Sequence, residues 1–385
     1  MKILYVTTVG ETMIFFEELI RRLIQEGNTV DIATNEQGSM VPGCYREWNC
    51  RIYRLDCTRA VLDFGNIRAM KQLRKLVSKN RYDIVHCHTP IAAACVRIAC
   101  KSLRKKGVKV IYTAHGFHFF RGAPVKNWLL FYPAEKFLSY WTDCLITINR
   151  EDYRRAKRKF HAQKTEYVPG VGVDVEKYQS PDFIQNEDNS CVPFSSWRRK
   201  KRAELGLGAD DFVIASVGEL NENKNHGVVI EAIARLNDKK IKYLICGQGE
   251  QKDKLLDFAR KLGLQKQVFL LGFRNDIKEI LWISDLFVFP SKREGLGLAA
   301  IEAMAAGLAL VTSNVHGIND YSVQKKTGYK CNPNDISGFQ KAIFQLIHNK
   351  EQRKSIGQEN RKKAFRYDRE LIIPKMKKIY YDEKK

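Results

Sequence analysis

Two glutamates, Glu294 and Glu302, have the residue type and spacing to bind a sugar nucleotide. A glycine-rich turn follows the first, and a strand expected at residues 285–290 leads into it. Glycines let a ligand approach the backbone closely, and the helix expected next offers free N–H groups and its positive dipole end to phosphate. Carboxylates instead accept hydrogen bonds from sugar hydroxyls. We therefore expect a ligand that carries both phosphate and sugar.

Three more turns in the second half of the chain follow expected strands and contain glycine. The first carries Lys224, whose ammonium group could meet a diphosphate as a point charge; an ordinary polar turn with a surface lysine is the alternative. The second lacks the third glycine of the dinucleotide fingerprint. The backbone of the third turn could contact the edge of a nucleobase. The alternative is that it is an ordinary turn at the end of a strand. The residues concerned are Gly218, Gly247, Gly249, Gly272 and Phe273.

These turns gain meaning together, because successive strands of a parallel sheet end at one edge, where ligands bind. Gly218, Gly247, Gly272 and Gly295 would then line one crevice beside the glutamate pair. The pattern indicates a nucleotide-sugar pocket.

The first half offers His115, which follows an expected strand and could hydrogen-bond a ligand near neutral pH. A structural histidine that caps a turn is the alternative. His118 either packs with its phenylalanine neighbours or lies on the acceptor side, and Gly10 would let an acceptor or sugar approach the backbone. The pair His86 and His88 suggests a metal, but it offers one strand end and no third ligand, so we expect no metal site.

Composition narrows the class of protein. The chain has 385 residues, a net charge of +23 and ten scattered cysteines without a Cys-x-x-Cys pair. We expect a reducing cytoplasm, with no signal peptide and no apolar run long enough to cross a bilayer. Basic clusters at residues 101–109, 154–159 and 198–202 are either a solvated face or a surface for anionic membrane. Nucleic acid is not expected, because none of its usual binding modules is present.

Apolar runs alternate with helical patterns, which predicts parallel α/β architecture. We expect an N-terminal domain at 1–178, a linker at 179–204 and a C-terminal domain at 205–364. The tail, about 365–385, is expected to pack back on the first domain, with Pro374 kinking or restarting its helix.

The glutamate pair resembles the signature of retaining glycosyltransferases of family 4. The resemblance implies the GT-B fold, in which two Rossmann-like, doubly wound parallel-sheet domains face a central cleft. The resemblance covers nearly the whole chain. After the turn at Gly10, six further segments match the family and occur in the family's order. These segments are residues 85–90, 113–117, 169–174, 223–225, 247–249 and 316–320.

The resemblance also implies roles. Glu302 would hold the nucleotide ribose and Glu294 the hydroxyls of the donor sugar. Lys224 would neutralise the departing diphosphate without a metal, and His115 would hydrogen-bond the donor sugar near the reacting carbon. Configuration would be retained by same-face attack, with a donor phosphate oxygen taking the acceptor's proton. The N–H groups that would meet sugar and phosphate are those around Gly295, Leu296, Gly297 and Leu298.

One position departs from the family pattern. Many members carry an arginine where this chain has Glu219, and a carboxylate cannot neutralise diphosphate. Lys292 or Arg293 could act beside Lys224 instead, or the backbone could carry more of the load.

We expect a metal-independent, cofactor-free transferase that moves sugar from a UDP-sugar to a lipid-linked saccharide in surface polysaccharide synthesis. It would be cytoplasmic or peripheral on the inner face of the plasma membrane. A UDP-sugar epimerase or phosphorylase on the same fold is one alternative, and a non-catalytic anion- or nucleic-acid-binding protein is another.

Overall fold

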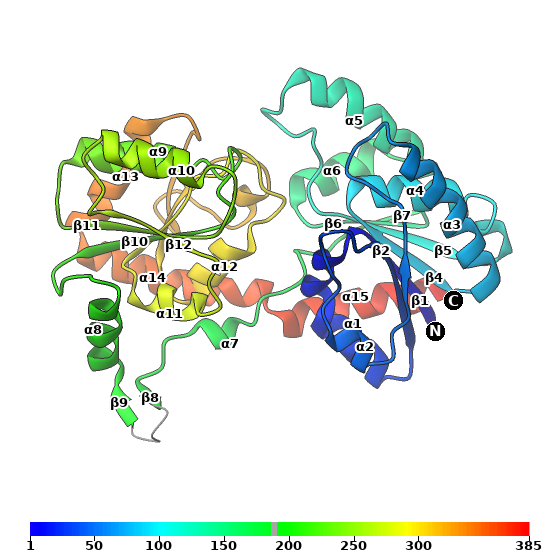
Figure 1. Ribbon diagram of the computed structural model, residues 1–385, viewed down its shortest axis with the longest axis horizontal. Coiled ribbons are helices and arrows are strands. Elements are labelled where there is room, and N and C mark those ends of the chain that lie inside the picture. Colours follow the sequence, from blue (N-terminus) through cyan, green and yellow to red (C-terminus); the bar gives the residue numbers. More distant parts are fainter. Residues whose placement is uncertain (186–190, 385) are drawn as a thin grey trace. The chain divides into compact units, whose positions relative to one another are not determined.

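The computed structural model describes residues 1–185 and 191–384. The chain divides into two compact units, residues 1–172 with 370–385 and residues 173–369. Each unit is built on a fully parallel sheet with helices on both faces (Figure 1). The expected α/β class with two doubly wound sheets is therefore confirmed.

The first unit contains a seven-stranded sheet in the order β3-β2-β1-β4-β5-β6-β7. Its strands are β1 (Lys2–Val9), β2 (Thr29–Asn35), β3 (Ile52–Arg54), β4 (Ile84–His88), β5 (Lys109–Ala114), β6 (Cys144–Thr147) and β7 (Lys164–Tyr167). Its helices are α1 (Glu17–Gln25), α2 (Cys44–Glu47), α3 (Phe64–Asn80), α4 (Pro90–Cys100), α5 (Val125–Leu138), α6 (Arg150–Lys159) and α15 (Arg369–Lys384).

The second unit contains a six-stranded sheet in the order β12-β11-β10-β13-β14-β15. Its strands are β10 (Phe212–Val217), β11 (Ile241–Cys246), β12 (Val268–Gly272), β13 (Leu286–Phe289), β14 (Ala309–Ser313) and β15 (Gly328–Cys331). Its helices are α7 (Val175–Tyr178), α8 (Phe194–Glu204), α9 (His226–Leu236), α10 (Lys252–Lys261), α11 (Ile277–Ile283), α12 (Leu298–Ala305), α13 (Ile336–His348) and α14 (Lys350–Ala364). A short hairpin of β8 (Phe183–Gln185) and β9 (Cys191–Pro193) precedes α8.

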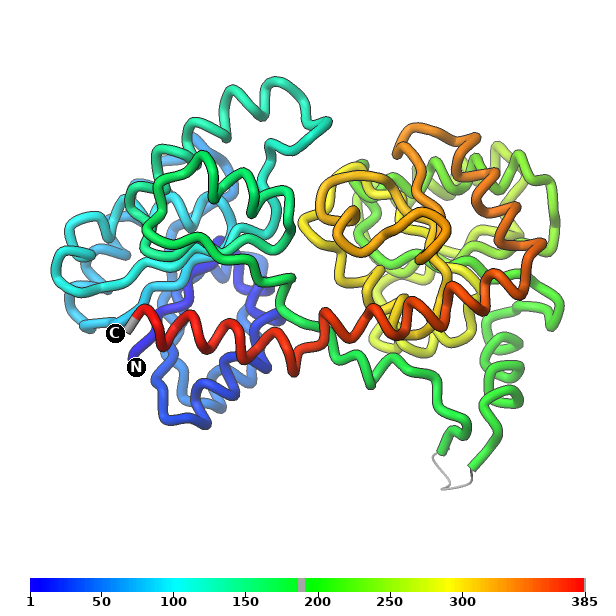
Figure 2. The backbone as a smooth tube through the Cα atoms, turned by 180° about the vertical axis from the view of Figure 1, so that it is seen from behind, coloured from blue at the N-terminus to red at the C-terminus, as the bar shows by residue number. Residues whose placement is uncertain are grey.

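The central strands form where the sequence is continuously apolar. Every residue of β13 is buried, as expected for a strand covered by helices on both faces. In the first unit, one core cluster lies under α3 and α4, and the other is completed by Ile372, Ile373 and Tyr380 of α15. Figure 2 shows α15 running along this unit, with both chain ends close together.

Pro374 does not interrupt the last helix, because α15 runs through it from Arg369 to Lys384. The helical tail is interrupted earlier: α14 ends at Ala364, a short 3₁₀ turn follows, and Asp368 has an extended backbone. The expected restart of the helix at Pro374 is therefore wrong.

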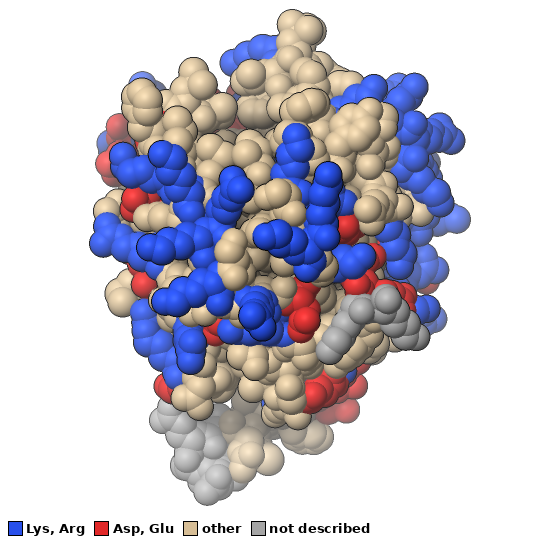
Figure 3. All heavy atoms as spheres, turned by 90° about the vertical axis from the view of Figure 1, so that its right-hand side faces the viewer, with Lys and Arg blue, Asp and Glu red and all other residues tan. Residues whose placement is uncertain are grey.

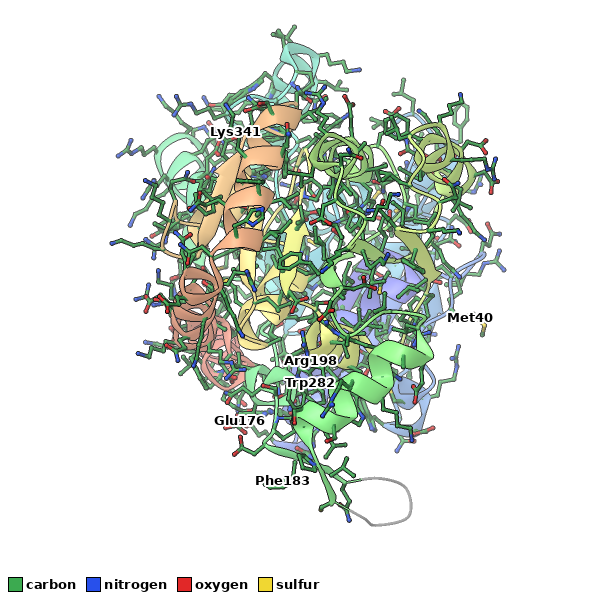
Figure 4. All side chains as sticks on the ribbon, turned by 90° about the vertical axis from the view of Figure 1, so that its left-hand side faces the viewer. Met40, Glu176, Phe183, Arg198, Trp282 and Lys341 are labelled. Atoms are coloured by element: carbon green, nitrogen blue, oxygen red, sulfur yellow. The ribbon has the colours of Figure 1, made fainter. Side chains whose placement is uncertain are left out.

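Residues 194–204 were expected in a linker but form α8. Arg202 is buried, and its guanidinium donates to the carbonyl of Ile283 at 2.7 and 2.9 Å and to Asp285 at 2.7 Å. Arg198 donates to the carbonyl of Trp282 at 3.0 Å, and the two residues lie together in Figure 4. The basic run thus satisfies carbonyls at the end of α11, a role that suits arginine at a helix C-terminus. Residues 186–190 of the expected linker lie outside the described residues.

No helix within residues 1–185 or 191–384 is long and apolar enough to cross a bilayer.

Candidate functional site

The sheet of the second unit reverses its direction of winding between β10 and β13. From β10 the chain proceeds outward to β11 and β12, and it then returns to place β13 on the other side of β10. Open α/β sheets bind ligands at such a switch point, beyond the carboxyl ends of the strands. The turns after β10 and β13 are those that contain Lys224 and Glu294.

An ion pair joins these two turns, between the ammonium group of Lys224 and the carboxylate of Glu294. The ammonium nitrogen also lies 5.2 Å from the ring centre of Phe289. The side chains of Lys224 and Glu294 are 20% and 13% exposed, so water reaches both. The site thus places one cation and one anion side by side, as a ligand with phosphate and hydroxyl groups requires.

Backbone contacts fix the ion pair in place. The side-chain amide of Asn223 donates from Nδ2 to the backbone carbonyl of Arg293 at 3.0 Å, and the backbone N–H of Lys292 donates to the backbone carbonyl of Asn223 at 2.8 Å. The Arg293 guanidinium is half-buried, and burial lowers its pKa from the usual value while nearby Glu294 acts in the opposite direction. Lys292, by contrast, is exposed.

Glu219 does not join this cluster. Its side chain is exposed and accepts from the amide of Asn221 at 2.7 Å. The carboxylate that replaces the family's arginine is thus held by a neighbour in its own turn.

The glycine turns after β10, β11 and β12 come together as the sequence predicts. The N–H of Gly218 donates to the carbonyl of Cys246 at 2.9 Å, and the N–H of Gly247 donates to the carbonyl of Gly272 at 2.8 Å. A Cβ on Gly247 would lie 1.9 Å from the carbonyl oxygen of Gly218, and one on Gly249 would lie 2.5 Å from that of Leu220. Their first requirement is therefore close packing of the turns. Phe273, beside them, is 69% exposed.

The turn that leads into α12 is equally constrained. Gly297 has a φ of +87°, and a Cβ there would lie 2.5 Å from the Phe289 ring. Gly317 packs against Gly295 and donates its N–H to the carbonyl of Glu294 at 3.1 Å. The Leu296 side chain is buried, and Leu298 is the first residue of α12. The backbone at the helix N-terminus is thus held rigidly, as an anion site needs.

Glu302, in the second turn of α12, has different surroundings from Glu294. Burial raises its pKa, while a hydrogen bond from the Tyr178 hydroxyl and the charge of Lys177 oppose that shift. No sequence signal pointed to Tyr178, which comes from α7 and lies far away along the chain. A carboxylate that accepts from one hydroxyl keeps lone pairs for another.

In the first unit, His115 belongs to a group of three histidines. Its Nε2 lies 3.1 Å from Nδ1 of His88, and the His88 ring lies 4.1 Å from that of His86, centre to centre. His86 contacts the hydroxyls of Tyr380 at 2.6 Å and Thr113 at 2.8 Å. Sequence reasoning missed this support for His115, because Tyr380 is 294 residues from His86.

Burial lowers the pKa of His86 to about 3 and that of His88 well below its usual value. Desolvation also lowers the pKa of His115 to about 4, although this residue is exposed at the surface of the unit. All three rings are therefore neutral at physiological pH. Among the described residues, no group of three or more His, Cys, Asp or Glu side chains could hold a metal ion.

Two residues expected on the acceptor side serve packing in this structure. A Cβ on Gly10 would lie 2.3 Å from the carbonyl oxygen of Ser39, so the lack of a side chain at Gly10 lets these two backbone segments pack closely. The ring of His118 packs 4.6 Å from that of Phe131, while Phe117 stacks on Phe119. His118 therefore packs against α5.

Comparison with known proteins adds the following. Residues 198–363 match the family model of glycosyl transferases group 1, and residues 2–149 match that of glycosyl transferase 4-like proteins. The chain is 37% identical to the glycosyltransferase EpsD of Bacillus subtilis, over 85% of this chain and 84% of that one. It is 31% identical to the UDP-Gal:alpha-D-GlcNAc-diphosphoundecaprenol alpha-1,3-galactosyltransferase of Escherichia coli, over 74% of this chain and 71% of that one.

Solved structures share the fold. HepE of Anabaena in complex with UDP superposes with a TM-score of 0.80 at 18% identity, over 99% of this chain and all of that one. Sucrose-phosphate synthase of Thermosynechococcus elongatus superposes with a TM-score of 0.80 at 19% identity, over 99% of both chains.

Proposed function

Because the chain belongs to glycosyltransferase family 4, whose members have the GT-B fold, we propose that it transfers a hexose from a UDP-sugar to a lipid-linked saccharide. The transfer retains anomeric configuration and needs no metal ion. The pathway is the assembly of a surface polysaccharide. The E. coli relative supports this choice of substrates, since its name specifies UDP-Gal and a diphosphoundecaprenol-linked acceptor.

The observation that carries the proposal is the Lys224–Glu294 pair at the switch point of the second sheet. In our proposal the donor's diphosphate replaces Glu294 as the ionic partner of Lys224. The Glu294 carboxylate then accepts hydrogen bonds from the sugar hydroxyls. The N–H groups at the start of α12 and the Arg293 guanidinium share the negative charge that develops as UDP leaves. Fixed positive groups stabilise that charge without reorganisation, so positioning supplies most of the catalysis.

Glu302 accepts from the ribose hydroxyls in this proposal, beside the bond it already receives from Tyr178. Neutral His115 hydrogen-bonds the donor sugar near the reacting carbon. The His88–His115 contact orients that ring. The acceptor attacks on the face from which UDP leaves, so no carboxylate nucleophile is required, and a donor phosphate oxygen takes the acceptor's proton.

The test is sugar transfer from a panel of UDP-sugars with EDTA present. We expect wild-type activity to persist, and Glu294→Gln to lower kcat/KM by about 10²–10³-fold, the scale of losing one transition-state contact. Glu302→Ala should mainly weaken UDP binding, measured by thermal stabilisation. Glu231→Gln, which removes a surface ion pair on α9, is the control. Undiminished activity in both site variants would exclude this assignment.

We also propose that the enzyme works on the cytoplasmic side of an anionic membrane. The basic clusters at residues 101–109 and 154–159 support this, as does the lipid-linked acceptor proposed above.

A further inference from the structure

Helix α5 exposes apolar side chains on its outward face. Val125, Leu129, Leu130 and Phe137 are 71%, 74%, 56% and 59% exposed, while the opposite face packs into the unit and buries Glu135. Single exposed apolar side chains are ordinary, but several on one helix mark an interaction surface. Four exposed apolar side chains on one helix therefore indicate a surface that an apolar partner covers.

Beside this face, between α5 and α6, lies an open hollow of about 390 Å³. Trp128 lines it from α5, and Arg155 is held over the Trp128 ring, 4.8 Å from its centre. Arg155 is also neutralised by Glu151, at 2.9 Å. The remaining basic lining residues are Arg154, Arg158 and Lys159, which are exposed and have no acidic partner among the described residues.

We propose that α5 inserts its outward face into the acyl–headgroup boundary of an anionic bilayer, while Arg154, Arg158 and Lys159 bind lipid phosphates. This inference rests on the proposed function, whose acceptor is lipid-linked. The proposed function invokes only electrostatic attraction to the membrane, and this inference adds a helix that inserts into it. Apolar residues beside cations and amphipathic aromatic rings are the composition of interfacial helices.

Charge complementarity selects the bilayer over other occupants. A second copy of this chain would bring the same excess of positive charge, +23 per chain, to the contact. Figure 3 shows Lys and Arg far outnumbering Asp and Glu on the face of the first unit that it presents. A nucleic acid would satisfy the cations but would leave the apolar face of α5 in water.

The experiment measures binding of the full chain to vesicles of phosphatidylcholine with and without phosphatidylglycerol, at low and high salt. We expect binding to require phosphatidylglycerol and to persist in part at high salt, because insertion is not screened. The double variant L129S/L130S should lose the salt-resistant part, with binding at least about tenfold weaker. F344S, which removes an apolar side chain 52% exposed on α13, is the matched control and should bind as wild type.

The variant R154Q/R158Q tests the cations separately. At about fivefold per charge, its binding at low salt should weaken roughly 25-fold. Wild-type binding that high salt abolishes completely, or L129S/L130S binding equal to wild type, would overturn the insertion of α5. Self-association in place of vesicle binding would overturn it in favour of a second copy.

Transfer to a water-soluble acceptor and stabilisation by UDP separate this inference from the enzyme assignment. L129S/L130S should retain both. UDP stabilisation without vesicle binding would overturn the membrane inference and leave the transferase standing, and vesicle binding without UDP affinity would do the reverse.

Discussion

At the scale of single residues, the two signature glutamates have different partners. Glu294 forms an ion pair with Lys224, whereas Glu302 accepts from the Tyr178 hydroxyl and has its pKa raised by burial. Their identity and spacing were readable in the sequence. Their partners were not, because Lys224 is 70 residues from Glu294 and Tyr178 lies in a segment that carries no signature.

The buried histidines of the first unit predict acid sensitivity. The pKa of His86 is lowered to about 3 by burial, so the folded chain stays neutral there while the unfolded chain takes up a proton near pH 6.5. Stability is therefore independent of this group above about pH 7 and decreases as pH falls toward 3, by about 1.4 kcal/mol per pH unit.

Urea unfolding of the first unit between pH 7.5 and 4.5 measures this slope. We expect His86→Gln, whose amide can still contact Tyr380 and Thr113, to reduce it by about 1.4 kcal/mol per pH unit. His161→Gln, at an exposed histidine, is the control. An unchanged slope in His86→Gln would exclude His86 as the source.

At the scale of elements, the turns after β10, β11 and β12 pack together only because glycines in them have no side chain. Gly218, Gly247 and Gly272 were expected to share one edge, and their backbone hydrogen bonds bear this out. From the sequence, these glycines were expected to let a ligand approach the backbone. The structure adds that Gly247 must be glycine for its turn to contact the neighbouring turn.

Gly247→Ala tests this requirement. Its Cβ would lie 1.9 Å from the Gly218 oxygen at a φ of +151°, so we expect the free energy of unfolding of the second unit to decrease by about 2–4 kcal/mol. Stabilisation by UDP should be lost as well. Denaturant unfolding and UDP-dependent thermal shifts measure both effects.

The control is Gly227→Ala in the same unit, where the nearest atom to an added Cβ is 3.9 Å away. It should change stability by no more than about 1 kcal/mol. Equal effects of the two substitutions would contradict the role of the Gly218–Gly247 contact.

At the scale of the whole molecule, the last helix completes the unit that the first strand begins. The hydroxyl of Tyr380 contacts that of Tyr5 in β1 and lies 2.6 Å from the ring of His86 in β4. Ile372, Ile373 and Tyr380 are nearly inaccessible to solvent in the same core. The histidine group near the proposed acceptor side is thus built from both ends of the chain.

Tyr380→Phe would remove the hydroxyl that contacts the Tyr5 hydroxyl and the His86 ring, and it would leave these two buried polar groups without that partner. We expect the free energy of unfolding of the first unit to decrease by about 1–3 kcal/mol, with the second unit unaffected. Tyr381→Phe is the control, because its hydroxyl bonds exposed Glu26 at 2.8 Å and its side chain is 39% exposed. Thermal unfolding monitored for both units distinguishes the two variants, and equal shifts would contradict the buried network.

The sequence by itself determined the fold class, the strands and the edge at which the glycine turns and Glu294 gather. Those properties follow from local hydrophobic periodicity and from the geometry of parallel sheets. It missed α8, whose arginines bond carbonyls far along the chain, and it did not foresee that the last helix runs unbroken through Pro374. Only the tertiary structure decided that Lys224 meets Glu294 and that Tyr380 supports His86. Such pairings arise when packing brings remote residues together, and no local pattern in the chain encodes them.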